Sequence, residues 1–107
     1  MEKRCKEVGA LLILDEIQTG IGRTGKLFGF ENYNCNPDII VYGKGLGGGV
    51  PIGAFTSSKD KMDVLHINPI LGHITTFGGN PLISAAALAT LKIILNTKIM
   101  KLSLIHI

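Results

Sequence analysis

Two short apolar runs, each ending at a charged side chain, constrain the fold more than any other feature of the chain. Ala10–Glu16 reads ALLILDE and Pro37–Lys44 reads PDIIVYGK. Runs of this length that are apolar at consecutive positions are typical of strands buried on both faces, as in a parallel sheet. Because the carboxyl ends of parallel strands meet at one edge, we expect Asp15 and Lys44 at the same end of the sheet.

Three helical segments are predicted around these strands. Residues 1–8 are expected to end a charged helix that stops at Gly9, and residues 59–67 to form a short helix. Asn80 can cap a further helix that has Pro81 at its first position. That helix presents a broad apolar face through about Leu95.

The rest of the chain predicts one more strand and a long loop. The glycine-broken segment 17–36 is expected to be a loop with one helical turn around Lys26–Tyr33, and PIGAFTSS, residues 51–58, to be a third strand. Strands that alternate with longer connections favour a mostly parallel α/β sheet. Three strands cannot close such a sheet or cover both of its faces, so we expect part of a larger domain.

Composition argues against several classes of function. The 107 residues carry a formal charge of +3, but the basic residues are scattered, so no nucleic-acid partner is expected. Cys5 and Cys35 form neither a CxxC pair nor a Cys/His spacing, so neither a disulfide framework nor a metal site is expected. The apolar runs are too short to cross a membrane and no signal peptide is recognisable, so we expect a cytoplasmic protein.

The last six residues, LSLIHI, are interpreted as foreign to the domain. They are the in-frame translation of a DNA text that resembles a common sequencing-transposon end. We therefore predict that residues 1–101 belong to the native domain and that residues 102–107 are a non-native tail. A genomic locus in which these codons continue a longer native reading frame would contradict this prediction.

Asp15 and Gln18 are the first candidate site residues. Asp15 follows four apolar residues and is expected in a partly buried place, where a carboxylate needs a cation or strong donors. Gln18, three residues on, could supply an amide to the same site. The alternatives are a helix cap or structural ion pair for Asp15 and a solvated loop position for Gln18.

Lys44 is the second candidate. A lysine at a half-buried strand end has its charged form disfavoured, which lowers its pKa and makes it a nucleophile able to form an imine. Glycines 45, 47, 48 and 49 would leave room beside it for a planar group. The alternatives are an incidental surface lysine in a tight turn and a phosphate loop, although GKGLGGG lacks the GxxxxGK[ST] spacing.

Thr75 and Thr76 form the third candidate. Flanked by glycines and just upstream of a predicted helix, they offer hydroxyl and backbone donors for an anion; the alternative is turn and cap chemistry. His73 is interpreted as a loop or packing residue. A carboxylate, an imine-forming lysine and a phosphate cradle are together the requirements of pyridoxal 5′-phosphate.

Three ordered blocks carry a resemblance to a known family. LLILDEIQTGIGRTGKLFGFE, PDIIVYGKGLGGGVPIGAF and HITTFGGNPL resemble successive blocks of the class III aminotransferases, over nearly all of residues 9–96. This fold-type-I pyridoxal-phosphate family includes acetylornithine, ornithine and 4-aminobutyrate aminotransferases. The resemblance implies a central fragment of the large cofactor-binding domain, whose mostly parallel sheet is flanked by helices and has one antiparallel strand, IGAFTSS.

The resemblance also implies roles for the candidate residues. Asp15 would pair with the pyridine nitrogen, and Gln18 would bond near the 3-hydroxyl of the cofactor. Lys44 would hold the internal aldimine and shuttle the proton between the substrate and the cofactor. Thr76, with Thr75 beside it, would reach the phosphate across the interface of a homodimer. Arg23 is assigned no role.

The implied function is a pyridoxal-phosphate-dependent transaminase that moves an amino group from an amine or ω-amino acid to a 2-oxo acid through a lysine aldimine. An aminomutase or a decarboxylase of the same family is an alternative, and a non-catalytic glycine-rich anion-binding module is an alternative of another class. The family's upstream phosphate loop, its aromatic stack and its substrate-carboxylate arginines cannot be located in these residues. The isolated chain is therefore expected to be inactive.

Overall fold

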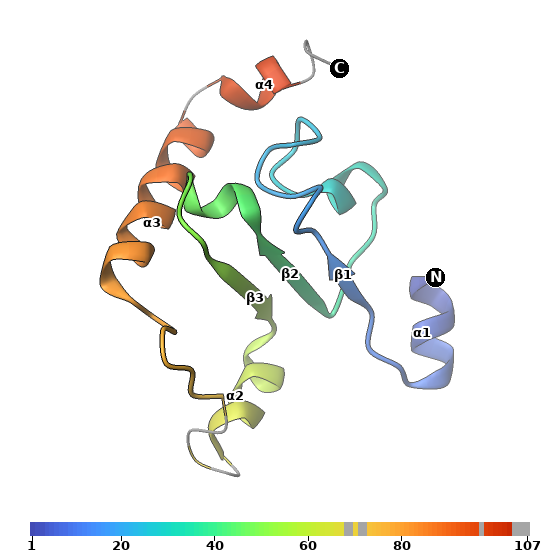
Figure 1. The fold of residues 1–107 in the computed structure, drawn as a ribbon. Coiled ribbons are helices and arrows are strands. Elements are labelled where there is room, and N and C mark those ends of the chain that lie inside the picture. Colours follow the sequence, from blue (N-terminus) through green and yellow to red (C-terminus); the bar gives the residue numbers. More distant parts are fainter. Residues whose placement is uncertain (68–69, 71–72, 97, 104–107) are drawn as a thin grey trace.

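A mixed three-stranded sheet forms the centre of the computed structural model, which describes residues 1–67, 70, 73–96 and 98–103 (Figure 1). The strands lie in the order β1 (Ile13–Asp15), β2 (Ile39–Gly43) and β3 (Gly53–Ser57). β1 and β2 are parallel, with Asp15 opposite Val41, whereas β3 runs antiparallel to β2. The sheet confirms the α/β class and the antiparallel third strand.

Helices and short 3₁₀ turns precede, separate and follow the strands along the chain. They are α1 (Glu2–Val8), the 3₁₀ turns η1 (Gly29–Asn32) and η2 (Lys44–Gly47), α2 (Lys59–Ile67), α3 (Pro81–Asn96) and α4 (Ile99–Ser103). α1 ends at Gly9, whose left-handed φ of 68° suits glycine. α3 begins after Asn80, whose Oδ1 accepts hydrogen bonds from the Leu82 and Ile83 amides at 3.0 and 3.2 Å. The predicted helices are confirmed; η2 and α4 were not predicted.

The small core lies between three elements rather than on the sheet alone. Ile21 from the loop after β1, Leu46 from η2 and Ala87 from α3 form one buried cluster. α3 therefore packs against η2, at the end of the sheet where β2 finishes (Figure 1). This packing fixes the position of the segment that follows β2.

The expectation of strands buried on both faces is wrong for this chain. Leu11 and Ile13 keep 54% and 55% of their surface exposed, and β2 is only half-buried between Ile39 and Tyr42. β1 is also shorter than its apolar run. The reason is that the described helices pack at the ends and edges of the sheet, so little covers its faces (Figure 1).

Two further expectations concern the membrane and the tail. Within the described residues, none of the helices combines the length and the apolar character that a bilayer span requires. Residues 104–107 of the predicted tail lie outside the described residues, whereas Leu102 and Ser103 are the last residues of α4. The prediction of a non-native tail therefore stays a prediction.

Candidate functional site

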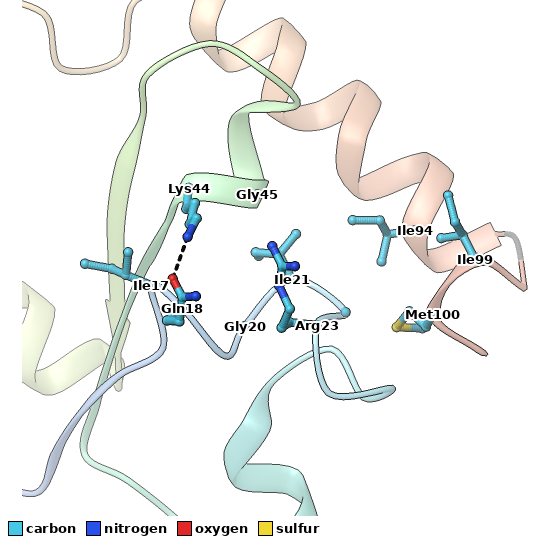
Figure 2. A pocket seen from close by; sticks show the side chains of 11 residues that line it. Ile17, Gln18, Gly20, Ile21, Arg23, Lys44, Gly45, Ile94, Ile99 and Met100 are labelled. Carbon is cyan, nitrogen blue, oxygen red and sulfur yellow. Dashed lines mark hydrogen bonds between the residues drawn. The ribbon is translucent and has the colours of Figure 1, made fainter. Parts of the chain in front are cut away.

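The carboxyl ends of β1 and β2 bring Gln18 and Lys44 into contact. Lys44 follows β2 directly, and Gln18 lies in the turn after β1. The Lys44 Nζ donates a hydrogen bond of 2.6 Å to the Gln18 Oε1 (Figure 2). The two side chains meet because the strands are parallel neighbours, so both turns leave the sheet at the same edge.

Lys44 and Gln18 line a cleft of about 190 Å³. The other lining residues come from the loop after β1, from η2 and from the end of α3 with α4: Ile17, Gly20, Ile21, Gly22, Arg23, Gly45, Ile94, Ile99 and Met100. Figure 2 shows apolar side chains on the α3 and α4 side, facing the Lys44–Gln18 pair. Both ionisable lining residues, Lys44 and Arg23, are basic.

Two lining residues have a left-handed backbone that is uncommon outside glycine. Lys44 has a φ of 42° and Ile21 a φ of 54°. Such conformations persist only where the surrounding structure enforces them. Here Ile21 is buried against Leu46 and Ala87. Because Leu46 lies two residues after Lys44, packing of the core holds the backbone conformation on both sides of the cleft.

The sequence analysis was wrong about the burial of the two principal candidates. It predicted Lys44 at a half-buried strand end and Asp15 in a partly buried place, but both are exposed. The loop after β1, η2 and α3 pack together at this end of the sheet, but they bury Ile21, Leu46 and Ala87 rather than the two candidate side chains. Exposure leaves both side chains accessible to a small molecule.

Asp15 lies at the same sheet edge but does not line the cleft. Its Oδ1 accepts a hydrogen bond of 2.9 Å from the Ile17 amide, a local turn contact. It lines a neighbouring hollow with Leu14, Thr19 and Phe30. The structure therefore brings Gln18 to Lys44, and it places Asp15 beside them in a separate hollow.

Two of the glycines after Lys44 allow other side chains to pack closely, rather than leaving open space beside the lysine. A Cβ at Gly47 would lie 3.1 Å from the Ile52 Cγ2, and a Cβ at Gly48 would overlap the Thr90 Oγ1. The room predicted at these two positions is thus filled by the chain's own side chains. Gly49 has no atom within 4 Å of an added Cβ.

Thr75 and Thr76 are not brought to Lys44. They are exposed and line a different hollow, with Gly53 and Asn80. Because Asn80 already accepts from the first free amides of α3, an anion here would depend on the threonine hydroxyls and on loop amides. The Nδ1 of His73 lies 3.4 Å from a backbone carbonyl, that of Leu65, which agrees with its interpretation as a loop residue.

The sequence analysis missed Glu16. Only 4% of its surface is exposed, and its carboxylate accepts hydrogen bonds from Thr19 Oγ1 and from the Gly29 and Phe30 amides. The available signal was a second carboxylate after Asp15 with a threonine three residues on. The amide partners lie thirteen and fourteen residues away, so the chain alone does not indicate them.

Comparison with known proteins decides the family. The Aminotransferase class-III profile matches residues 1–103. The chain belongs to the class-III aminotransferases. This confirms the resemblance carried by the three sequence blocks.

Solved structures of aminotransferases share the fold. Ornithine δ-aminotransferase from Plasmodium falciparum is 42% identical with a TM-score of 0.82, over 92% of this chain and 25% of that one. Ornithine aminotransferase from Toxoplasma gondii, whose structure has partial occupancy of pyridoxal phosphate at the active site, gives the same identity and TM-score over 92% and 22%. An S-selective transaminase from Arthrobacter sp. is 38% identical with a TM-score of 0.82, over 92% and 21%.

These relatives show how much of the fold is present. The chain spans a quarter or less of the length of each of the three. Its mixed sheet and helices match that part of the fold-type-I aminotransferase structure, as predicted.

Proposed function

We propose that this chain carries the lysine-bearing part of a pyridoxal-phosphate-dependent transaminase. The reaction would move an amino group from an amine or ω-amino acid to a 2-oxo acid. The observation that supports it most is the contact between Lys44 and Gln18 at the ends of two parallel strands, beside a cleft whose ionisable lining residues are basic.

Lys44 and Gln18, which meet at the cleft, fit the cofactor, and Asp15 is a third candidate from the same edge of the sheet. Lys44 supplies the primary amine that would hold the aldehyde, and Gln18 supplies an amide next to it for the ring hydroxyl. Asp15, at the same sheet edge, would supply the carboxylate for the pyridine nitrogen. When bound, pyridoxal phosphate withdraws electrons from the carbon that bears the substrate nitrogen.

Lys44 would also move the proton. Its Nζ ends a flexible stem and is exposed, so it can turn from Gln18 toward a substrate in the cleft. A free amine at this atom would take the proton from the substrate carbon that bears nitrogen and hold it for return. Gln18 Oε1, as an acceptor 2.6 Å away, would orient the ammonium formed in that step.

The threonine pair suggests a homodimer. The family resemblance implies that Thr76 reaches the phosphate of another copy, and this is supported by the place of Thr75 and Thr76 in an exposed hollow apart from Lys44. A second copy would supply the cleft, with Thr76 reaching across the interface. We further propose a cytoplasmic enzyme with small-molecule amino donors and 2-oxo acid acceptors.

Substitution of Lys44 tests the function in a full-length class-III aminotransferase that carries this segment. We expect Lys44→Ala to abolish amino transfer to a 2-oxo acid and the visible absorbance of the lysine-bound cofactor. Borohydride reduction should fix the cofactor to the wild-type peptide that contains Lys44. Lys26→Ala is the matched control, because Lys26 is an exposed lysine of the loop after β1 that does not line the cleft, and it should leave both properties unchanged. Activity and label retained in Lys44→Ala would refute the proposal.

A further inference from the structure

Glu16 is a buried acid that the proposed chemistry does not use. Every polar group of this residue is bonded. Its amide donates to the Val41 carbonyl at 2.7 Å, and its carbonyl accepts from the Gly20 amide at 2.7 Å. Its carboxylate accepts from Thr19 Oγ1, from the Gly29 amide at 2.9 Å and from the Phe30 amide at 2.8 Å. One residue thus joins β2, the turn after β1 and the start of η1.

These bonds close the turn that contains Gln18. Gln18 lies between Glu16 and Thr19, inside the turn that the Glu16 carbonyl and carboxylate close. The contacts are close enough to require glycine at one partner, since a Cβ at Gly20 would lie 2.7 Å from the Glu16 carbonyl oxygen. The backbone carbonyl of Glu16 thus closes the turn on Gly20, and its carboxylate ties the same turn to Thr19, Gly29 and Phe30.

We propose that Glu16 is a positioning residue that holds the Gln18 amide against Lys44. It touches neither the cleft nor Lys44, so its effect on the reaction would pass through the turn that carries Gln18. The inference rests on the function proposed above, because only that function gives the Gln18–Lys44 contact a role. The competing explanation is a structural clip that stabilises the loop without affecting Gln18.

The chemistry of the carboxylate makes the proposal testable by a small change. Two carboxylate oxygens accept all three donors, whereas glutamine would replace one acceptor with an NH₂ group that faces a donor. Glu16→Gln keeps the size of the side chain and breaks at least one of these bonds. Glu31→Gln is a matched control: Glu31 accepts from the Phe28 amide at 2.8 Å in the same loop, away from the turn of Gln18.

A double-mutant cycle separates the two explanations in the full-length enzyme. The variants are Glu16→Gln, Gln18→Ala and the pair, and the readouts are the single-turnover rate of amino transfer and the pH at which the visible band of bound cofactor changes. We expect Glu16→Gln alone to slow the reaction about tenfold, the lower end of what loss of a supporting partner costs in metal sites. In the Gln18→Ala background it should slow the reaction less than about twofold and leave the pH of the band change unmoved.

A measurement without cofactor adds an independent check. In the cofactor-free protein, Glu16→Gln should speed hydrogen exchange at Gly29 and Phe30 and should change the ¹⁵N relaxation of the Gln18 side-chain amide. A structural clip would give the faster exchange and an unchanged Gln18 amide. Glu31→Gln should leave the Gln18 amide and the reaction rate as in the wild type.

The outcomes are distinguishable. Equal slowing by Glu16→Gln with and without Gln18, or an unchanged Gln18 amide, would overturn the positioning role. If Glu16→Gln fails to fold, Thr19→Val removes one of the three donors. It should show the same coupling to Gln18→Ala, with a smaller effect, and additive effects there would also overturn the role.

A wild-type enzyme without amino transfer or cofactor uptake would refute the proposed function, whereas an active wild type with additive variants would refute only this inference.

Discussion

The backbone of Lys44 is held where few side chains are stable. A left-handed φ costs a non-glycine residue about 1–2 kcal/mol, and both Lys44 and Ile21 have one. The buried contacts of Ile21 and Leu46 offset that cost, because neither can move without opening the core. The lysine is thus directed by the packing of its neighbours as well as by its own contact with Gln18.

Gly48 gives a prediction at this scale. Its φ is 60°, and an added Cβ would overlap the Thr90 Oγ1, which is held by its bond of 3.0 Å to the Ala86 carbonyl. We expect Gly48→Ala to destabilise the full-length protein by at least about 1–2 kcal/mol from the backbone alone, measured by urea unfolding. Gly53→Ala is the control, since a Cβ there meets nothing within 4 Å, and it should change stability by less than about 0.5 kcal/mol. Equal effects of the two substitutions would contradict the packing role of Gly48.

Single residues of the site were predictable to different degrees. The pair of turns that carry Gln18 and Lys44 follows from two parallel strands, which the apolar runs indicate. The exposure of Lys44 was not predictable, because the burial of a strand end depends on which other elements pack against it, and these are distant in sequence. Glu16 was missed for a similar reason: its amide partners are distant in sequence, and the adjacent Asp15 was interpreted as the chemically active acid.

At the scale of elements, Asp38 joins the starts of both parallel strands to α2. Its Oδ2 accepts from the Leu12 amide at 2.9 Å, and its Oδ1 lies 3.3 Å from the Lys61 Nζ. The Leu12 amide and, secondly, Lys61 hold the pKa of the Asp38 carboxyl below its usual range. The ionised form is thus favoured in the folded state, so the stability it contributes is present above the ordinary pKa and is lost as the pH falls through the lowered value.

Asp38→Asn should remove that acid dependence. We expect the variant to be less stable than the wild type at neutral pH, and the difference to shrink below about pH 4 as the wild-type carboxyl becomes protonated. Thermal unfolding of the full-length protein between pH 3 and pH 7 measures it. Asp60→Asn, at an exposed acid of α2, is the control and should keep the wild-type pH profile. A difference that stays constant with pH would contradict the assignment.

Elements with local signals were predicted and those made by tertiary contacts were not. Gly9 and the Asn80–Pro81 pair are local signals, and the helix ends lie where they indicate. η2 was not predicted because GKGLGGG reads as a glycine turn; its helical conformation depends on burial of Leu46 against Ile21 and α3. β1 is shorter than its apolar run because pairing with β2 covers only part of it.

The whole molecule is flat and open. Its principal extents are 45, 37 and 19 Å, and its radius of gyration is 15.6 Å, against about 13 Å for a compact chain of this length. Its accessible surface is 7878 Å², against about 5800 Å² for a folded monomer of this mass. The excess surface includes large apolar side chains on the sheet and α3, such as Ile13, Phe55 and Ile93. In the Plasmodium falciparum relative, of which this chain covers 25%, further chain is available to cover such surface.

This surface predicts how the 107 residues behave on their own. The buried cluster of Ile21, Leu46 and Ala87 is small, so it cannot offset the conformational entropy of ordering the whole chain. We expect the isolated polypeptide to associate or to remain molten: it should enhance the fluorescence of the apolar dye ANS, unfold over a broad temperature range and take up no stoichiometric pyridoxal phosphate. The control is the full-length aminotransferase that carries the segment, which should melt sharply and bind little dye. A sharp, cooperative melt of the isolated chain with one cofactor bound per chain would contradict this prediction, because the segment would then fold without any further chain to cover its exposed apolar faces.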